Sequence, residues 1–214
     1  MGEDPKNVFV VGCPSIDIIK ELDLNLLPNF NFSLSKPYLL VVFHSVTTDP
    51  SENNVLMAES IIKTVEELNI PTIFLGSNVD AGSKELGLVI KKFIEKRPPF
   101  VYSAKLLSPD IFYRVLAKAA CAIGNSSSFI REGAFLGTPA VIVGSRQHKR
   151  ERGENVKEVA IETKEIKKAV MEQIKHGPYP RNLMFGAGDA GQKIAEILAK
   201  AEPKIQKKFF DLKI

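Results

Sequence analysis

The chain has 214 residues, 44% hydrophobic and 25% charged, which is typical of a soluble globular protein and long enough for one α/β domain. Its net charge of +4 is mild, and the basic residues are spread along the chain. This pattern suits a small anionic ligand and argues against a nucleic-acid partner. No apolar run approaches the roughly 20 residues of a membrane helix, and the N-terminus lacks the apolar segment of a secretory signal. We therefore expect a cytoplasmic protein with no membrane partner.

Cysteine and histidine usage disfavours a metal centre. The two cysteines, Cys13 and Cys121, have no metal-ligand spacing, and no cluster of His, Cys, Asp or Glu supplies one. Cys121 lies in an apolar run, as expected of a small buried residue. We expect neither a metal ion nor a cofactor.

The first element in chain order is the apolar, strand-like run at 7–11. The stretch from Cys13 to Lys36 that follows lacks a convincing crossover helix. We interpret residues 1–36 as a strand and hinge that belong to, or lead from, a missing N-terminal domain. Residues 37–214 form the main domain, and we expect the segment 7–11 to lack its sheet neighbours.

From residue 37 onward, apolar runs alternate with helical periodicity. The run at 38–43 is almost continuously apolar, as in a parallel strand buried on both faces. Further strands are predicted at 72–75, 100–102, 121–123 and 140–143. Helices are predicted from 50 to 69, around 86–93, from 109 to 119, after 128, around 166–174 and from 191 to 201.

This alternation predicts an α/β fold with a doubly wound, Rossmann-like parallel sheet. In the usual order, the third, second and first strands lie on one side and the fourth and fifth on the other. A crevice then opens between the carboxyl ends of the first and fourth strands. The loops that begin at His44 and at Gly124 should meet there, and we expect the face that carries His44 to be open.

Each polar residue near this crevice has two interpretations. The Gly-Asn-Ser-Ser turn at 124–127 either binds a phosphate at a helix N-terminus or is a plain serine cap. Glu132, in the next turn, either accepts from two ribose hydroxyls or stabilises the helix dipole. His44 either donates a hydrogen bond to a phosphate or shuttles a proton, or it has only a structural role. Arg146 lies in a charged loop that is either solvated or pairs with phosphoryl oxygens.

Several segments together resemble the C-terminal domain of the hydrolysing UDP-N-acetylglucosamine 2-epimerases, which include the sialic-acid-pathway enzymes of bacteria and animals. They include Val-Gly-Cys-Pro-Ser-Ile-Asp (11–17), His-Ser-Val-Thr-Thr-Asp (44–49), Ile-Gly-Asn-Ser-Ser (123–127) and Gly-Glu-Asn-Val (153–156). Shorter matches lie at 78–84, 131–135, 137–139, 146–147 and 186–188. The resemblance spans essentially the whole chain, in order.

The resemblance implies a GT-B-like enzyme of two Rossmann-type domains, of which this chain is the C-terminal half. UDP or a UDP-N-acetylhexosamine would be the ligand. The family reaction is elimination of UDP after loss of the C2 proton, then addition of water to give N-acetylmannosamine. Ser126 and Ser127 would hold the diphosphate, and Arg146 the phosphates. His44 corresponds to a histidine implicated in catalysis.

The resemblance also implies nucleoside contacts. Glu132 would bind the ribose hydroxyls, the backbone around Leu106 and Leu107 would meet the uracil, and Asn78 would lie nearby. Ser45 departs from the family pattern, in which a proline commonly follows the histidine.

The family's acid/base carboxylates come from an N-terminal domain that the chain does not match. We therefore expect a UDP-binding half, inactive alone, that forms a homo-oligomer or pairs with an N-terminal domain. Alternatives are a non-catalytic UDP-sugar-binding module and a GT-B glycosyltransferase domain, although the segment 44–49 argues against the latter. A diacetamido sugar substrate would share these motifs.

Overall fold

The computed structural model of the chain describes residues 3–26, 30, 36–47, 51–76, 83–96, 98–202, 206 and 209–211. At its centre is a six-stranded parallel sheet in the order β3-β2-β1-β4-β5-β6. The strands are β1 (Leu39–Val42), β2 (Thr72–Leu75), β3 (Val101–Ala104), β4 (Cys121–Gly124), β5 (Ala140–Val143) and β6 (Val156–Val159). The predicted order of the first five strands is confirmed.

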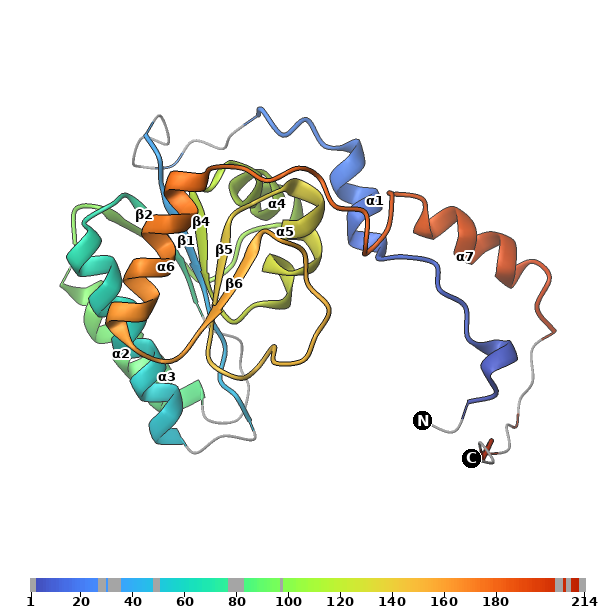
Figure 1. Ribbon diagram of the computed structural model, residues 1–214, viewed down its shortest axis with the longest axis horizontal. Helices are drawn as coiled ribbons and strands as arrows, with labels where there is room; N and C mark the ends of the chain where they lie inside the picture. The colour runs from blue at the N-terminus through green and yellow to red at the C-terminus, as the bar shows by residue number, and fades with distance from the viewer. Residues whose placement is uncertain are drawn as a thin grey trace.

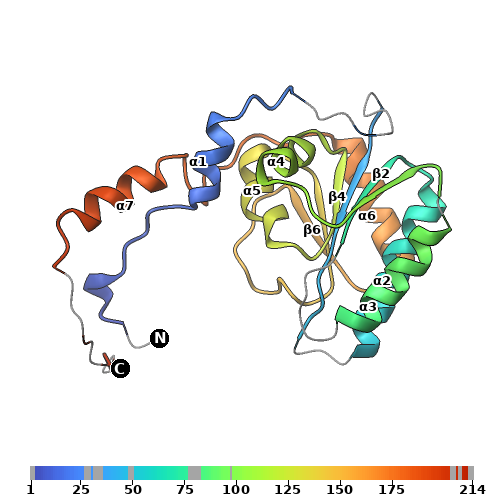
Figure 2. The same cartoon turned by 180° about the vertical axis from the view of Figure 1, so that it is seen from behind.

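Helices cover both faces of the sheet (Figures 1 and 2). On one face lie α2 (Ser51–Leu68), α3 (Ser83–Glu95) and α6 (Thr163–His176). On the other lie α4 (Pro109–Lys118) and α5 (Arg131–Leu136), which the 3-10 turn η2 (Ser127–Phe129) precedes. This three-layer arrangement is the Rossmann-like α/β fold that the alternating pattern predicts. No helix in the described ranges is both long and apolar enough to cross a membrane.

The central strand explains why its sequence is apolar throughout. Leu39 and Val41 point into the core beneath α2, α3 and α6, whereas Leu40 and Val42 point into the core on the α4 side. Side chains of a strand alternate between its faces, so a strand with a helical layer on each side needs apolar residues at every position.

Two elements, β6 and α1 (Pro14–Glu21), are absent from the sequence-based prediction. The sequence of β6 carries Lys157 and Glu158 between two valines, and every residue of this edge strand is partly exposed. In α1 only Ile16 and Ile19 are buried. One edge strand and one short helix give too little apolar signal to stand out against a loop.

Residues 7–11 have no sheet neighbours in the described part of the chain, as expected. Pro5–Asn7 is a 3-10 turn, η1, and Val8 is extended but pairs with no strand in the described part of the chain. Val8, Phe9 and Val10 are exposed. Apolar composition favours a strand only where a neighbouring strand can take up the backbone hydrogen bonds.

Helices α1 and α7 (Ala190–Leu198) lie side by side, apart from the sheet (Figures 1 and 2). The carboxylate of Asp17 accepts hydrogen bonds from the backbone N–H groups of Ala190 (3.1 Å) and Gly191 (2.6 Å). These are the first amides of α7, which have no acceptor within their own helix. Asp17 therefore caps α7 from a distant part of the sequence.

Candidate functional site

The predicted crevice lies where the strand order reverses. β1 pairs with β2 on one side and with β4 on the other, and Val42 stands opposite Gly124 in the register. Because both strands are parallel, the residues that follow them emerge at the same edge of the sheet. This is the position at which open α/β sheets bind ligands.

At this edge the loops after β1 and β4 are joined directly. The backbone N–H of His44 donates to Asn125 Oδ1, and Asn125 Nδ2 donates back to the carbonyl of His44, both at 2.8 Å. The predicted meeting of the His44 loop with the Gly-Asn-Ser-Ser turn is therefore confirmed. The residue His44 itself is only 8% exposed, and the open face expected around it stays a prediction.

Gly124 makes this close approach possible. Its φ of +141° lies in a region that L residues with side chains rarely adopt. A Cβ at this position would lie 2.0 Å from the carbonyl oxygen of Val42, in β1. Any other residue would force β1 and the start of the serine loop apart.

The serine loop forms a cap, but the α-helix begins later than predicted. Ser126 accepts a hydrogen bond from the backbone N–H of Ser128 at 3.3 Å and starts η2. The α-helix starts only at Arg131, so Glu132 lies in its first turn. The structural interpretation of Ser126 as an N-cap therefore holds, whether or not a phosphate also binds. Ser126 is buried, and the Ser127 residue is half-buried.

Arg146 borders the serine loop, as predicted. Its Nη1 donates to the backbone carbonyl of Asn125 at 3.2 Å, and Gln147 Nε2 donates to the same oxygen at 2.8 Å. Asn125 thus links the loops that follow β1, β4 and β5. Sequence reasoning assigned no role to Asn125 or Gln147. A polar residue directly after a buried strand and a positive-φ glycine is the signal that marks Asn125.

Glu132 is held from the N-terminal segment. It is 2% exposed, Ser15 Oγ donates to its Oε1 at 2.5 Å, and Arg131 Nη2 lies 3.6 Å from the same oxygen. Tyr113 lies nearby. Burial and the charge of Glu132 raise the pKa of Tyr113, against the opposite effect of its hydrogen bond with Ser15.

Some buried polar atoms have no hydrogen-bond partner. Within the described ranges these are Ser45 Oγ, Arg131 Nε, Glu132 Oε2, Gln147 Oε1 and Asn155 Oδ1. Ser45 follows β1 and Gln147 follows β5, at this edge of the sheet. Most buried polar atoms in proteins are paired, because an unpaired one costs about 1–3 kcal/mol. The two in the loops joined at Asn125, Ser45 Oγ and Gln147 Oε1, are of the kind that a bound polar ligand can pair.

The structure describes two of the three residues that are expected around the uracil. Leu106 and Leu107 follow β3, two strands away from β1 at the same edge of the sheet. Leu106 is 82% exposed, whereas Leu107 packs against the core on the α4 side. Asn78 lies outside the described residues.

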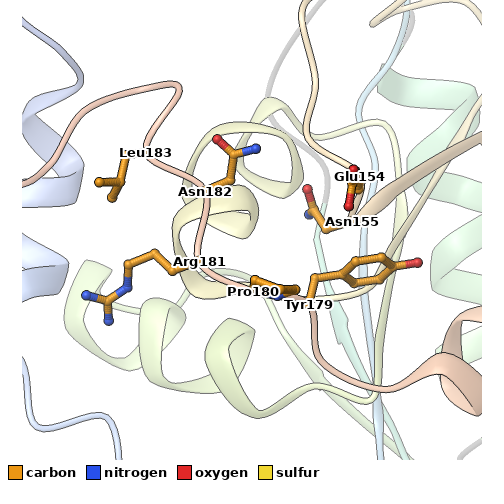
Figure 3. A pocket seen from close by; sticks show the side chains of 7 residues that line it. All are labelled: Glu154, Asn155, Tyr179, Pro180, Arg181, Asn182 and Leu183. Carbon is orange, nitrogen blue, oxygen red and sulfur yellow. The ribbon is translucent and has the colours of Figure 1, made fainter.

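Two pockets lie elsewhere on the surface. One, of about 640 Å³, is next to the Arg146 loop and includes His148 and Glu158. Burial alone would raise the pKa of Glu158, but hydrogen bonds from Arg152 and His148 lower it. The other, of about 300 Å³, lies between the turn at 154–155 and the segment 179–183 (Figure 3). Neither is lined by a predicted site residue. In the described part of the chain, no group of three or more His, Cys, Asp or Glu residues could hold a metal ion.

Comparisons with known proteins identify relatives of this chain and agree with its fold. The UDP-N,N'-diacetylbacillosamine 2-epimerase (hydrolyzing) of Legionella pneumophila is 29% identical over 202 residues, covering 92% of this chain and 53% of the relative. The UDP-N-acetylglucosamine 2-epimerase of Neisseria meningitidis is 26% identical, covering 100% of this chain and 58% of the relative. The chain therefore spans somewhat more than half the length of these relatives.

A crystal structure of UDP-GlcNAc 2-epimerase from Neisseria meningitidis, bound to UDP-GlcNAc, has the same fold. The TM-score is 0.69 at 16% identity, over 93% of this chain and 57% of that one. A family model described as UDP-N-acetylglucosamine 2-epimerase matches residues 1–199. The match covers nearly the whole described fold, including the loops joined at Asn125. The chain belongs to the UDP-N-acetylglucosamine 2-epimerase family.

Proposed function

We propose that this chain binds the UDP part of UDP-N-acetylglucosamine and is the nucleotide-binding half of a hydrolysing 2-epimerase. The observation that carries the proposal is the joining of three polar loops at Asn125, where the strand order reverses. A diphosphate in this crevice would meet a cation from Arg146 and hydroxyls from Ser126 and Ser127. Such groups bind phosphoryl oxygens by charge-assisted hydrogen bonds.

The chemistry of the proposed reaction starts at C2 of the sugar. A base removes the C2 proton, the C1–O bond breaks, and its electron pair leaves with UDP as a C1–C2 double bond forms. Water then adds its hydroxyl to C1, and a proton returns to C2 from the opposite side, which gives N-acetylmannosamine. Arg146 and the serine hydroxyls would stabilise the negative charge of the departing diphosphate. His44 would donate a hydrogen bond or a proton to the same departing diphosphate.

The proton transfers themselves are assigned to groups outside this chain. In the resemblance on which the proposal draws, the acid/base carboxylates belong to an N-terminal domain. We therefore propose that the chain alone binds UDP and does not turn over substrate. In this proposal, the chain gains the acid/base groups by pairing with such a domain or by self-association.

A second candidate substrate is a UDP-linked 2,4-diacetamido sugar. The Legionella pneumophila relative, at 29% identity, carries the name of a hydrolysing diacetylbacillosamine epimerase. In this proposal the described site residues bind the nucleotide part that both substrates share, so they would not distinguish the two sugars.

The test uses the purified 214-residue chain. Isothermal titration calorimetry should detect UDP binding and a weaker uridine affinity, because uridine lacks the diphosphate. A coupled assay with UDP-N-acetylglucosamine should detect no N-acetylmannosamine. The diacetamido substrate, assayed in parallel, should also remain unchanged.

Each part of the proposal can fail separately. Absence of UDP binding would contradict the nucleotide site. Robust release of the epimerised sugar by the pure chain would instead show that the acid/base groups lie within it.

A further inference from the structure

We propose that Ser15, in the first turn of α1, is a positioning residue for the ribose site. It holds one oxygen of the Glu132 carboxylate, and this leaves the other oxygen for a ribose hydroxyl. The inference rests on the proposed function, because it takes Glu132 as the ribose ligand.

The two oxygens of Glu132 have different surroundings. Oε1 accepts from Ser15 Oγ at 2.5 Å and lies 3.6 Å from Arg131 Nη2. Oε2 is buried and has no hydrogen-bond partner in the described part of the chain. An ionised carboxylate has acceptors only, so a donor must complete it. The 2′- and 3′-hydroxyls of a ribose are donors of this kind.

The hydrogen bond from Ser15 has a defined direction. A serine hydroxyl has one proton, and a carboxylate cannot donate, so the Ser15 proton lies toward Glu132. Cys13 Sγ is 2.9 Å from the same serine oxygen. The Cys13 thiol is therefore the donor in that second contact. Ser15 also has a hydrogen bond with Tyr113. The contacts of Ser15 with Cys13, Tyr113 and Glu132 together fix the hydroxyl and, through it, the carboxylate.

Packing holds Ser15 in place independently of Glu132. Ile16 and Ile19 of α1 are buried against Tyr113 and Phe135, from α4 and α5. Ser15 is thus attached to the same side of the sheet as the helix that carries Glu132. A carboxylate anchored at one oxygen keeps its orientation, whereas an unanchored one rotates and loses affinity for a directional ligand.

The experiment compares UDP with 2′,3′-dideoxy-UDP, which lacks both ribose hydroxyls, by calorimetry on the full chain. The unchanged chain should prefer UDP. Ser15→Ala should weaken UDP binding about fivefold to tenfold, as expected for the net contribution of one hydrogen bond. It should leave the affinity for the dideoxy compound unchanged. Ser15→Thr retains a hydroxyl and should restore the preference.

Two further variants separate positioning from folding. Asp17→Ala loosens α1 from α7 without removing a contact to Glu132, and should not change the preference for UDP. In a Glu132→Ala background, Ser15→Ala should have no further effect. Equal weakening of both nucleotides, or tighter UDP binding by Ser15→Ala, would overturn the role of Ser15. Failure of the unchanged chain to bind UDP, or to distinguish the two nucleotides, would overturn the proposed site together with it.

Discussion

Arg146 and Gln147 donate to the same carbonyl oxygen, but only Arg146 brings a charge to it. We predict that Arg146→Ala weakens UDP binding far more than uridine binding. Gln147 still donates to the Asn125 carbonyl in this variant, so a selective loss of UDP affinity would point to a contact between Arg146 and phosphate. A charge-assisted bond contributes about 1.5–3 kcal/mol, which corresponds to roughly tenfold or more in affinity. Calorimetry with both ligands measures the difference.

Arg150→Ala is the matched control for this prediction. Arg150 lies in the same loop, carries the same charge and is exposed. Its removal should change the affinity for UDP by less than about threefold, because exposed charges are screened. Equal losses for UDP and uridine in Arg146→Ala would mean that Arg146 acts on the fold of the loop.

At the residue scale, the strand order predicted which loops lie next to each other, but it did not predict which side chains form hydrogen bonds. The meeting of His44 with the serine loop follows from strand order, and so does the place of Arg146. The hydrogen bonds of Asn125 to His44 and of Ser15 to Glu132 join residues 81 and 117 positions apart. Such contacts depend on side-chain geometry, which neither periodicity nor spacing encodes.

At the scale of elements, the contact between β1 and the serine loop depends on one glycine. We predict that Gly124→Ala destabilises the protein by about 3 kcal/mol or more, from the strained φ and the clash together. The new methyl group would lie 2.0 Å from the Val42 carbonyl oxygen and 2.7 Å from its carbon. Both are backbone atoms of the central strand, so they cannot rotate away. Urea denaturation measures the change.

Gly87→Ala, in α3, is the control. A methyl group there would have no neighbour within 4 Å. Replacing a helix-interior glycine by alanine should stabilise the protein by up to about 1 kcal/mol. If the two variants were equally stable, the close approach at Gly124 would not limit the fold.

Elements with strong patterns were predicted, and those with weak patterns were not. The buried strands β1, β2, β4 and β5 are apolar at nearly every position and were found from the sequence. The edge strand β6 has mixed polarity, and the eight-residue α1 buries only two side chains, so both were missed. The run at 7–11 is apolar too, but it has no sheet neighbours among the described residues and forms no strand there.

At the scale of the whole molecule, burial makes the fold sensitive to alkali. It raises the pKa values of Tyr38, Tyr113 and the Cys121 thiol. The unfolded chain therefore loses these protons first, from about pH 9–10 upward. Since the unfolded state then binds fewer protons, the free energy of unfolding falls as pH rises. The contribution is complete below this range and is lost as pH rises through it toward the folded values.

Tyr38→Phe tests this prediction. Tyr38 donates its hydroxyl proton to the Val115 carbonyl at 2.7 Å, so the variant should lose about 1 kcal/mol at neutral pH. Its stability should then decline less steeply between roughly pH 9 and 11, the range set by ordinary thiol and phenol pKa values. Urea denaturation across this range gives both slopes. Parallel slopes would show that Tyr38 does not contribute to the alkaline loss.

The cap that Asp17 provides for α7 also sets an order of events during synthesis. Asp17 and Ala190 are 173 positions apart. A ribosome that adds about 5–20 residues per second needs roughly ten to thirty-five seconds to cover that separation. Throughout this interval, all six strands are made while Asp17 has no α7 amide to accept from. The contact between α1 and α7 can therefore form only after all six strands have been translated.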